Sequence, residues 1–89
     1  MIRVRILISG EVTGVFFRAF IKENSDRLGI KGYVRNVNNN LEAVLEGKKE
    51  KIEELIDLCK IGPVAAKVSD VVVKDEEYTG GFEDFSILF

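Results

Sequence analysis

Residues 30–46 read IKGYVRNVNNNLEAVLE and predict a β-hairpin. The segments 30–37 and 41–46 are rich in residues that favour an extended chain. Between them, the three consecutive asparagines at 38–40 supply turn chemistry, because asparagine tolerates a positive φ. The two segments are therefore expected to pair as neighbouring antiparallel strands.

A helix is predicted before this hairpin, over residues 17–28. Its apolar positions are Phe17, Phe20, Ile21 and Leu28. Asn24 occupies the one position of this helical pattern where no apolar residue stands. This spacing is typical of one helix face. Gly29 follows at the position where helices often end.

A second helix is predicted after the hairpin, where residues 48–60 read KKEKIEELIDLCK. The apolar side chains at i, i+3, i+4 and i+7 are Ile52, Leu55, Ile56 and Cys59. Charged residues fill the opposite face, which is the pattern of an amphipathic surface helix. Gly62 and Pro63 end it.

Further strands are predicted at both ends of the chain. Residues 2–8 alternate between apolar and other side chains, residues 67–74 form another strand, and residues 85–89 alternate into the C-terminus. Residues 9–16 are predicted to be a loop. The order is β-α-β-β-α-β with an extra short C-terminal strand. It predicts a single α+β domain over residues 1–89, a two-layer ferredoxin-like sandwich with both helices on one face of a mainly antiparallel sheet.

Composition disfavours several kinds of function. The net charge is −2, with 13 basic and 15 acidic residues, which argues against binding to a nucleic-acid backbone. The chain has no histidine and one cysteine, Cys59, so a zinc site is not expected. No apolar run approaches the roughly 20 residues of a membrane span. A single cysteine fits a reducing compartment, so we expect a cytoplasmic protein.

One edge of the predicted sheet gathers residues suited to an anion. A right-handed crossover makes strands 2–8 and 30–37 parallel, so both end at that edge. The loop after the first strand leads into a helix, whose free N–H groups and dipole favour negative charge. Gly10 and Gly14 allow unusual loop conformations, and Arg18 offers a bidentate clamp for phosphate. Asn36, at the end of the second strand, should point to the same site.

Taken singly, these residues also have ordinary interpretations. Arg18 alone would be a solvated helix residue, and Asn36 a turn residue at a strand end. The apolar residues of this region, interpreted as loop packing and core, are Val12, Val15, Phe16 and Phe17.

The combination resembles the acylphosphatase family. Residues 8–18, ISGEVTGVFFR, resemble its signature, and residues 32–36, GYVRN, resemble its second block. Weaker likeness extends to GPVAAKV at 62–68 and TGGFEDFSIL at 79–88. Two positions depart from the usual pattern, with Thr13 in place of Gln and Glu11 where a basic residue is common.

The resemblance implies hydrolysis of a small acyl phosphate to a carboxylate and inorganic phosphate, with no metal or cofactor. It implies that Asn36 orients the attacking water. It also implies that the phosphoryl group is bound by Arg18 and the backbone N–H groups of Thr13, Gly14, Val15, Phe16, Phe17 and Arg18. A monomer is expected.

Non-catalytic functions remain as alternatives at this point. A ferredoxin-like module could bind a small anion or a protein, or a phosphorylated or carbamoylated ligand within a larger assembly. RNA-binding versions stack bases on aromatic residues of the open sheet face. Tyr33 is the main candidate there, and the acidic balance disfavours this function.

Overall fold

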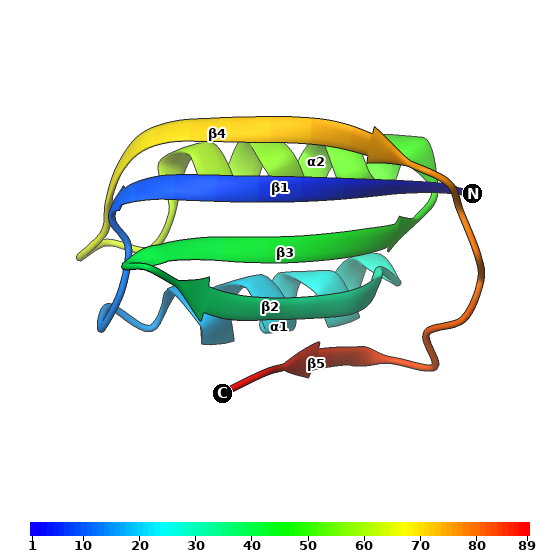
Figure 1. Cartoon of the computed structure of the whole chain (residues 1–89), viewed down its shortest axis with the longest axis horizontal. Coiled ribbons are helices and arrows are strands. Elements are labelled where there is room, and N and C mark those ends of the chain that lie inside the picture. Colours follow the sequence, from blue (N-terminus) through cyan, green and yellow to red (C-terminus); the bar gives the residue numbers. More distant parts are fainter.

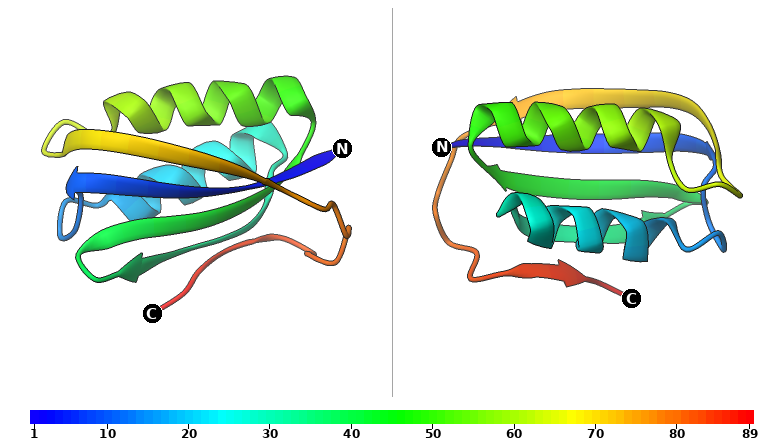
Figure 2. Two further views of the ribbon diagram at one scale, coloured as in Figure 1. Left: turned by 45° about the horizontal axis from the view of Figure 1, so that its top comes forward. Right: turned by 180° about the vertical axis from the view of Figure 1, so that it is seen from behind.

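Two helices cover one face of a five-stranded sheet (Figures 1 and 2). The structure is a computed structural model that describes residues 1–89. Its elements are β1 (Ile2–Glu11), α1 (Phe17–Leu28), β2 (Lys31–Val37), β3 (Asn40–Gly47), α2 (Lys49–Ile61), β4 (Lys67–Glu76) and β5 (Phe85–Ile87).

The strand order in the sheet is β4-β1-β3-β2-β5. All neighbours are antiparallel except β2 and β5, which are parallel. Because β3 lies between β1 and β2, those two strands run in the same direction and end at the same edge (Figure 1). The predicted ferredoxin-like sandwich with an extra C-terminal strand is confirmed.

The first strand is longer than predicted. Residues 9–11 were expected in a loop, but they belong to β1 and pair with β4. The pairing shifts register between Ser9 and Gly10, and Gly10 has a φ of 125°. A Cβ at Gly10 would collide with the Lys67 carbonyl oxygen of β4. Glycine therefore serves strand packing at position 10, and the loop is shortened to residues 12–16.

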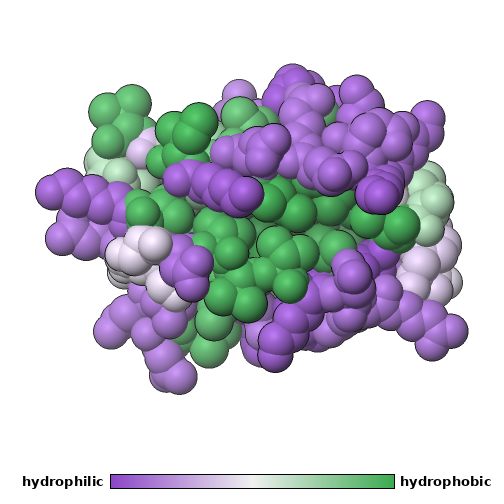
Figure 3. Space-filling view, turned by 90° about the horizontal axis from the view of Figure 1, so that it is seen from above, coloured by the Kyte–Doolittle hydropathy of each residue, from purple (hydrophilic) through white to green (hydrophobic).

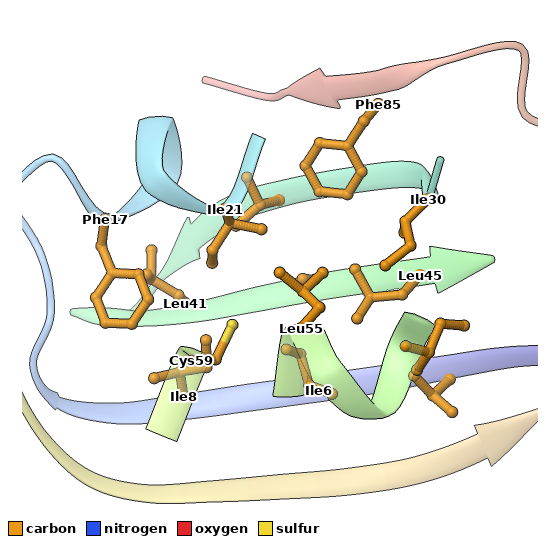
Figure 4. Packing of buried hydrophobic residues seen from close by; sticks show 14 of the residues in the cluster. Ile6, Ile8, Phe17, Ile21, Ile30, Leu41, Leu45, Leu55, Cys59 and Phe85 are labelled. Atoms are coloured by element: carbon orange, nitrogen blue, oxygen red, sulfur yellow. The ribbon is translucent and has the colours of Figure 1, made fainter. Parts of the chain in front are cut away.

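The two helices bury apolar faces against the sheet. In Figure 4, Phe17 and Ile21 of α1 and Leu55 and Cys59 of α2 point into one core with Ile6 and Ile8 of β1 and Leu41 and Leu45 of β3. The predicted role of Asn24 is wrong, because the fully buried residue between Ile21 and Leu28 is Ser25. Burial raises the pKa of the Cys59 thiol to about 12. Cys59 is thus a neutral core residue and not a nucleophile.

Charged side chains cover much of the sheet's open face. Glu76 accepts hydrogen bonds from Arg3 Nε at 2.9 Å and from Arg5 Nε at 2.7 Å. Glu46 is only 3% exposed and accepts bonds from the Thr79 backbone N–H at 3.0 Å and from the Thr79 hydroxyl at 3.2 Å. Its Oε2 also lies 3.5 Å from Arg3 Nη1. These contacts tie the segment before β5 to the centre of the sheet.

Glu46 is expected to make stability depend on pH. Burial alone would raise its pKa, but the Thr79 bonds and Arg3 outweigh burial and leave the pKa below its ordinary value of 4.5. Its stabilisation is therefore present above about pH 4.5 and is lost as the pH falls through the lower folded-state pKa. Glu46→Gln should lower the free energy of unfolding by ~1–2 kcal/mol at pH 7, with a smaller difference at pH 3.

Urea unfolding of both proteins at pH 7, 5 and 3 measures this effect. Glu83→Gln is the matched control, because Glu83 is exposed and forms no ion pair. A wild-type advantage over Glu46→Gln that stays constant from pH 7 to pH 3 would show that the ionised carboxylate contributes nothing.

The outer edge of β4 has no neighbouring strand. The face that contains this edge shows an apolar band between two hydrophilic regions (Figure 3), and Val72 and Val73 of β4 are 41% and 42% exposed. The strand also carries exposed charges at Lys67, Asp70 and Lys74. Charges along an edge strand oppose its pairing with another chain.

Candidate functional site

Arg18 and Asn36 line one cleft at the edge where β1 and β2 end. The cleft has a volume of about 340 Å³. Arg18 is the second residue of α1, and Asn36 lies near the end of β2 opposite Leu41 of β3. Asn36 shares a face with Val34, which is completely buried beneath the helices. Alternation along β2 therefore directs Asn36 to the helix side of the sheet.

The loop between β1 and α1 has an alternating backbone conformation. Gly14 has a φ of 69° and Phe16 a φ of 62°, so left-handed residues flank Val15. Such alternation turns successive N–H groups toward a shared concavity that suits an anion. Gly14 lines the cleft, and its α-carbon faces open space. The loop is therefore shaped to present backbone donors to the cleft.

These backbone donors have no partner within the protein. No backbone hydrogen bond outside the regular elements has a donor in residues 13–19. The first bond at the start of α1 runs from Phe20 N–H to the Phe16 carbonyl oxygen at 3.0 Å. The first turn of α1 contains no acidic residue that would compete for the same donors. The start of α1 can thus accept an external anion.

Arg18 is the only one of the five arginines without a carboxylate partner. The other four form ion pairs, and they are Arg3, Arg5, Arg27 and Arg35. The Arg18 guanidinium carbon instead lies 4.9 Å from the centroid of the Phe89 ring. A guanidinium beside free N–H groups, with no carboxylate within ion-pair distance, is suited to bidentate binding of phosphate.

The predicted site residues divide into two groups. Gly14, Phe16, Phe17, Arg18 and Asn36 all line the cleft, whereas Thr13 and Val15 do not. The backbone N–H groups of Thr13 and Val15 are nevertheless among those without a partner in the protein. Their predicted contribution to phosphate binding, through main-chain atoms, stays a prediction.

The apolar residues of the loop differ in burial. Val12 and Phe17 are both 1% exposed, and Val15 packs against the core. The interpretation of Phe16 as core packing is wrong, because its side chain is 85% exposed. The left-handed backbone places Phe16 at the N-cap of α1, outside the face that α1 buries.

Residues that sequence reasoning missed also line the cleft, namely Ala19, Ile87 and Phe89. The alternation of Phe85, Ile87 and Phe89 correctly indicated a final strand, but β5 ends at Ile87 and the prediction that Phe89 belongs to it is wrong. It gave no sign that β5 pairs with β2 and places Ile87 opposite Val34, two residues from Asn36.

The polar groups of the cleft are a guanidinium, an amide and N–H donors. These groups suit an anion better than a metal cation. No group of three or more His, Cys, Asp or Glu side chains is arranged to bind a metal ion. None of the helices combines the length and the apolar character that a membrane crossing requires.

Comparison with known proteins gives a consistent result. The family model described as acylphosphatase matches residues 4–87. An acylphosphatase of Pyrobaculum calidifontis is 46% identical over 90 residues, covering 99% of this chain and 82% of the relative. The crystal structure of acylphosphatase from Bacillus subtilis superposes with a TM-score of 0.95 at 30% identity and covers 100% of both chains. Full-length HypF, in a phosphate- and nucleotide-bound form, matches with a TM-score of 0.90 at 30% identity, covering all of this chain and 12% of HypF.

Proposed function

The chain belongs to the acylphosphatase family and hydrolyses acyl phosphates, and we propose that Arg18, the loop backbone and Asn36 carry out this reaction. The observation that carries the proposal is the isolation of Arg18. It is the one arginine without a carboxylate, and it shares a cleft with Asn36 beside a row of free N–H groups. The non-catalytic binding module is not supported, because two relatives, matched over 82% and 95% of their own lengths, are named acylphosphatases.

The first step of the proposed mechanism is binding of the phosphoryl group. Its oxygens accept hydrogen bonds from the N–H groups of residues 13–18, and two of them accept parallel bonds from the Arg18 guanidinium. Phosphoryl transfer depends mainly on positioning and on stabilising charge that spreads over these oxygens. A fixed set of donors supplies both without any covalent intermediate.

The second step is attack by a water molecule that Asn36 orients. The water oxygen forms a bond to phosphorus, and the bond from phosphorus to the acyl oxygen breaks. The electron pair of that bond leaves with the carboxylate. The proton lost by the water is taken by a phosphate oxygen, so the products are a carboxylate and dihydrogen phosphate.

This chemistry explains why so few side chains are required. A carboxylate is a stable leaving group, so no general acid has to protonate it. The absence of histidine from the chain is therefore compatible with the reaction. Arg18 and the backbone donors stabilise negative charge, which a metal ion does in many other phosphoryl-transfer enzymes.

Hydrolysis is accordingly expected to be independent of metal ions. Turnover of benzoyl phosphate should change by less than about twofold after dialysis against EDTA, because the proposed charge-stabilising groups belong to the protein. Release of phosphate is measured with and without chelator, and again after Mg²⁺ is added back. Loss of turnover in EDTA that Mg²⁺ restores would contradict the metal-free mechanism.

Three predictions about the whole protein belong to the same proposal. Residues 1–89 act as one acylphosphatase-like domain, since one sheet and one core include all the strands and both helices. A monomer is expected, because the exposed charges along the edge of β4 oppose its pairing with a second chain. A cytoplasmic location agrees with the single free cysteine, Cys59.

A further inference from the structure

The cleft has an apolar side that the proposed mechanism does not use. Besides the phosphate-binding groups it is lined by Phe16, Ile87 and Phe89. We propose that these side chains form a subsite for the acyl group, which makes the enzyme favour acyl phosphates with an aromatic or large apolar acyl group over acetyl phosphate. This inference rests on the proposed function, because it requires the phosphoryl group to lie against Arg18.

The exposure of the two phenylalanines is the first observation. Phe16 is 85% exposed and Phe89 is 103% exposed. Neither ring contributes to the core, although both are large and apolar and the other cleft phenylalanine, Phe17, is 1% exposed. Two exposed aromatic rings on the lining of one cleft indicate a surface that contacts a ligand.

The backbone of Phe16 is the second observation. Its φ of 62° and ψ of 23° place a bulky residue in the left-handed region, where glycine is far more common. Its side chain makes no capping hydrogen bond for α1. Strained backbone of this kind gathers at ligand sites, where the surrounding structure maintains it. Packing of the core does not explain a phenylalanine at this position, whereas contact with a substrate does.

The position of Phe89 links the subsite to the reacting group. Its ring lies over the Arg18 guanidinium, with 4.9 Å between the guanidinium carbon and the ring centroid. In an acyl phosphate a single oxygen joins the phosphorus to the carbonyl carbon. An acyl group attached to a phosphoryl group at Arg18 therefore begins inside the same cleft, within reach of this ring.

The charges of the cleft define which acyl groups fit. Arg18 is the only charged residue that lines it, and in the proposed mechanism its guanidinium is already paired with the phosphoryl group. A second carboxylate or an ammonium group on the acyl chain would find no second charged side chain in the cleft to pair with. An aromatic or branched apolar acyl group would instead cover Phe89, Phe16 and Ile87.

The test compares kcat/KM for benzoyl phosphate with kcat/KM for acetyl phosphate. In Phe89→Ala the ratio of the two values should fall about tenfold, because the apolar contact serves only the larger acyl group. The change should appear mainly in KM for benzoyl phosphate. Phe89→Leu should retain much of the preference, since leucine is apolar. Phe16→Gly, which keeps the left-handed backbone, should also lower the ratio.

Controls separate this inference from the proposed function. Val72→Ala removes an exposed apolar side chain on β4 and should leave both rates unchanged. Equal losses for both substrates in Phe89→Ala, with weaker inhibition by inorganic phosphate, would show that the ring only supports Arg18 and would overturn the acyl subsite. Undiminished activity of Arg18→Ala on both substrates would instead overturn the proposed function.

Discussion

Replacing Arg18 with alanine is expected to lower kcat/KM for benzoyl phosphate by about 10³-fold or more. The guanidinium is the only side-chain cation in the cleft, so its removal leaves the charge of the phosphoryl group to the backbone donors alone. Competitive inhibition by inorganic phosphate should be lost together with turnover, because in the proposed mechanism Arg18 binds the phosphoryl group that substrate and product share. Steady-state kinetics with phosphate as inhibitor measure both effects.

Two further variants show whether the geometry of the guanidinium matters. Arg18→Lys keeps the positive charge but offers one ammonium in place of a planar fork, so it should also be a poor enzyme. Arg35→Ala is the matched control, because Arg35 is exposed and pairs with Glu42, at 2.9 Å, outside the cleft. Near-normal kinetics of Arg18→Ala would mean that Arg18 is an ordinary solvated helix residue.

The meeting of Arg18 and Asn36 could be predicted from the sequence. The periods of the apolar residues indicated a helix between two strands, and the handedness of such crossovers makes the two strands parallel. The C-terminal ends of β1 and β2 then lie at one edge, as the structure shows. This inference needed only the order of the elements, which local spacing determines.

The aromatic side of the cleft could not be predicted in the same way. Its position depends on the pairing of β5 with β2, which joins residues more than 50 positions apart, as in Gly32 and Phe85. The alternation of side chains within a strand does not indicate which other strand it pairs with. The exposure of Phe16 depends on a left-handed backbone that a phenylalanine seldom adopts, so its hydrophobicity pointed to the core.

The boundary of β1 shows a related limit. Ser9, Gly10 and Glu11 resemble loop residues by composition, yet they continue the strand because β4 supplies partners across a bulge. Composition indicates the conformational preference of a segment, but it does not indicate which strand the segment will pair with in the folded protein. The loop that remains is five residues long, which keeps its N–H groups close to Arg18.

Asn36 is expected to act on the water, and its loss should have a different kinetic signature from the loss of Arg18. Asn36→Ala should lower kcat for benzoyl phosphate by about 10²-fold, because an unoriented water seldom reaches the geometry of attack. KM and the inhibition constant for phosphate should change little, since the proposed role of the amide is to orient the water and not to bind the phosphoryl group. The Asn36 side chain is exposed and forms no hydrogen bond within the protein, so the variant should fold normally.

Asn36→Asp sharpens this test because it preserves size and adds a negative charge. A carboxylate beside the phosphate should weaken phosphate binding as well as turnover, and salt should lessen the effect by screening the repulsion. Asn40→Ala is the matched control, because Asn40 begins β3 and does not line the cleft. Phosphate affinity and kcat are measured for all three variants after circular dichroism has shown that they are folded. If Asn36→Ala hydrolyses benzoyl phosphate at the wild-type rate, Asn36 is only a residue at a strand end and another group must orient the water.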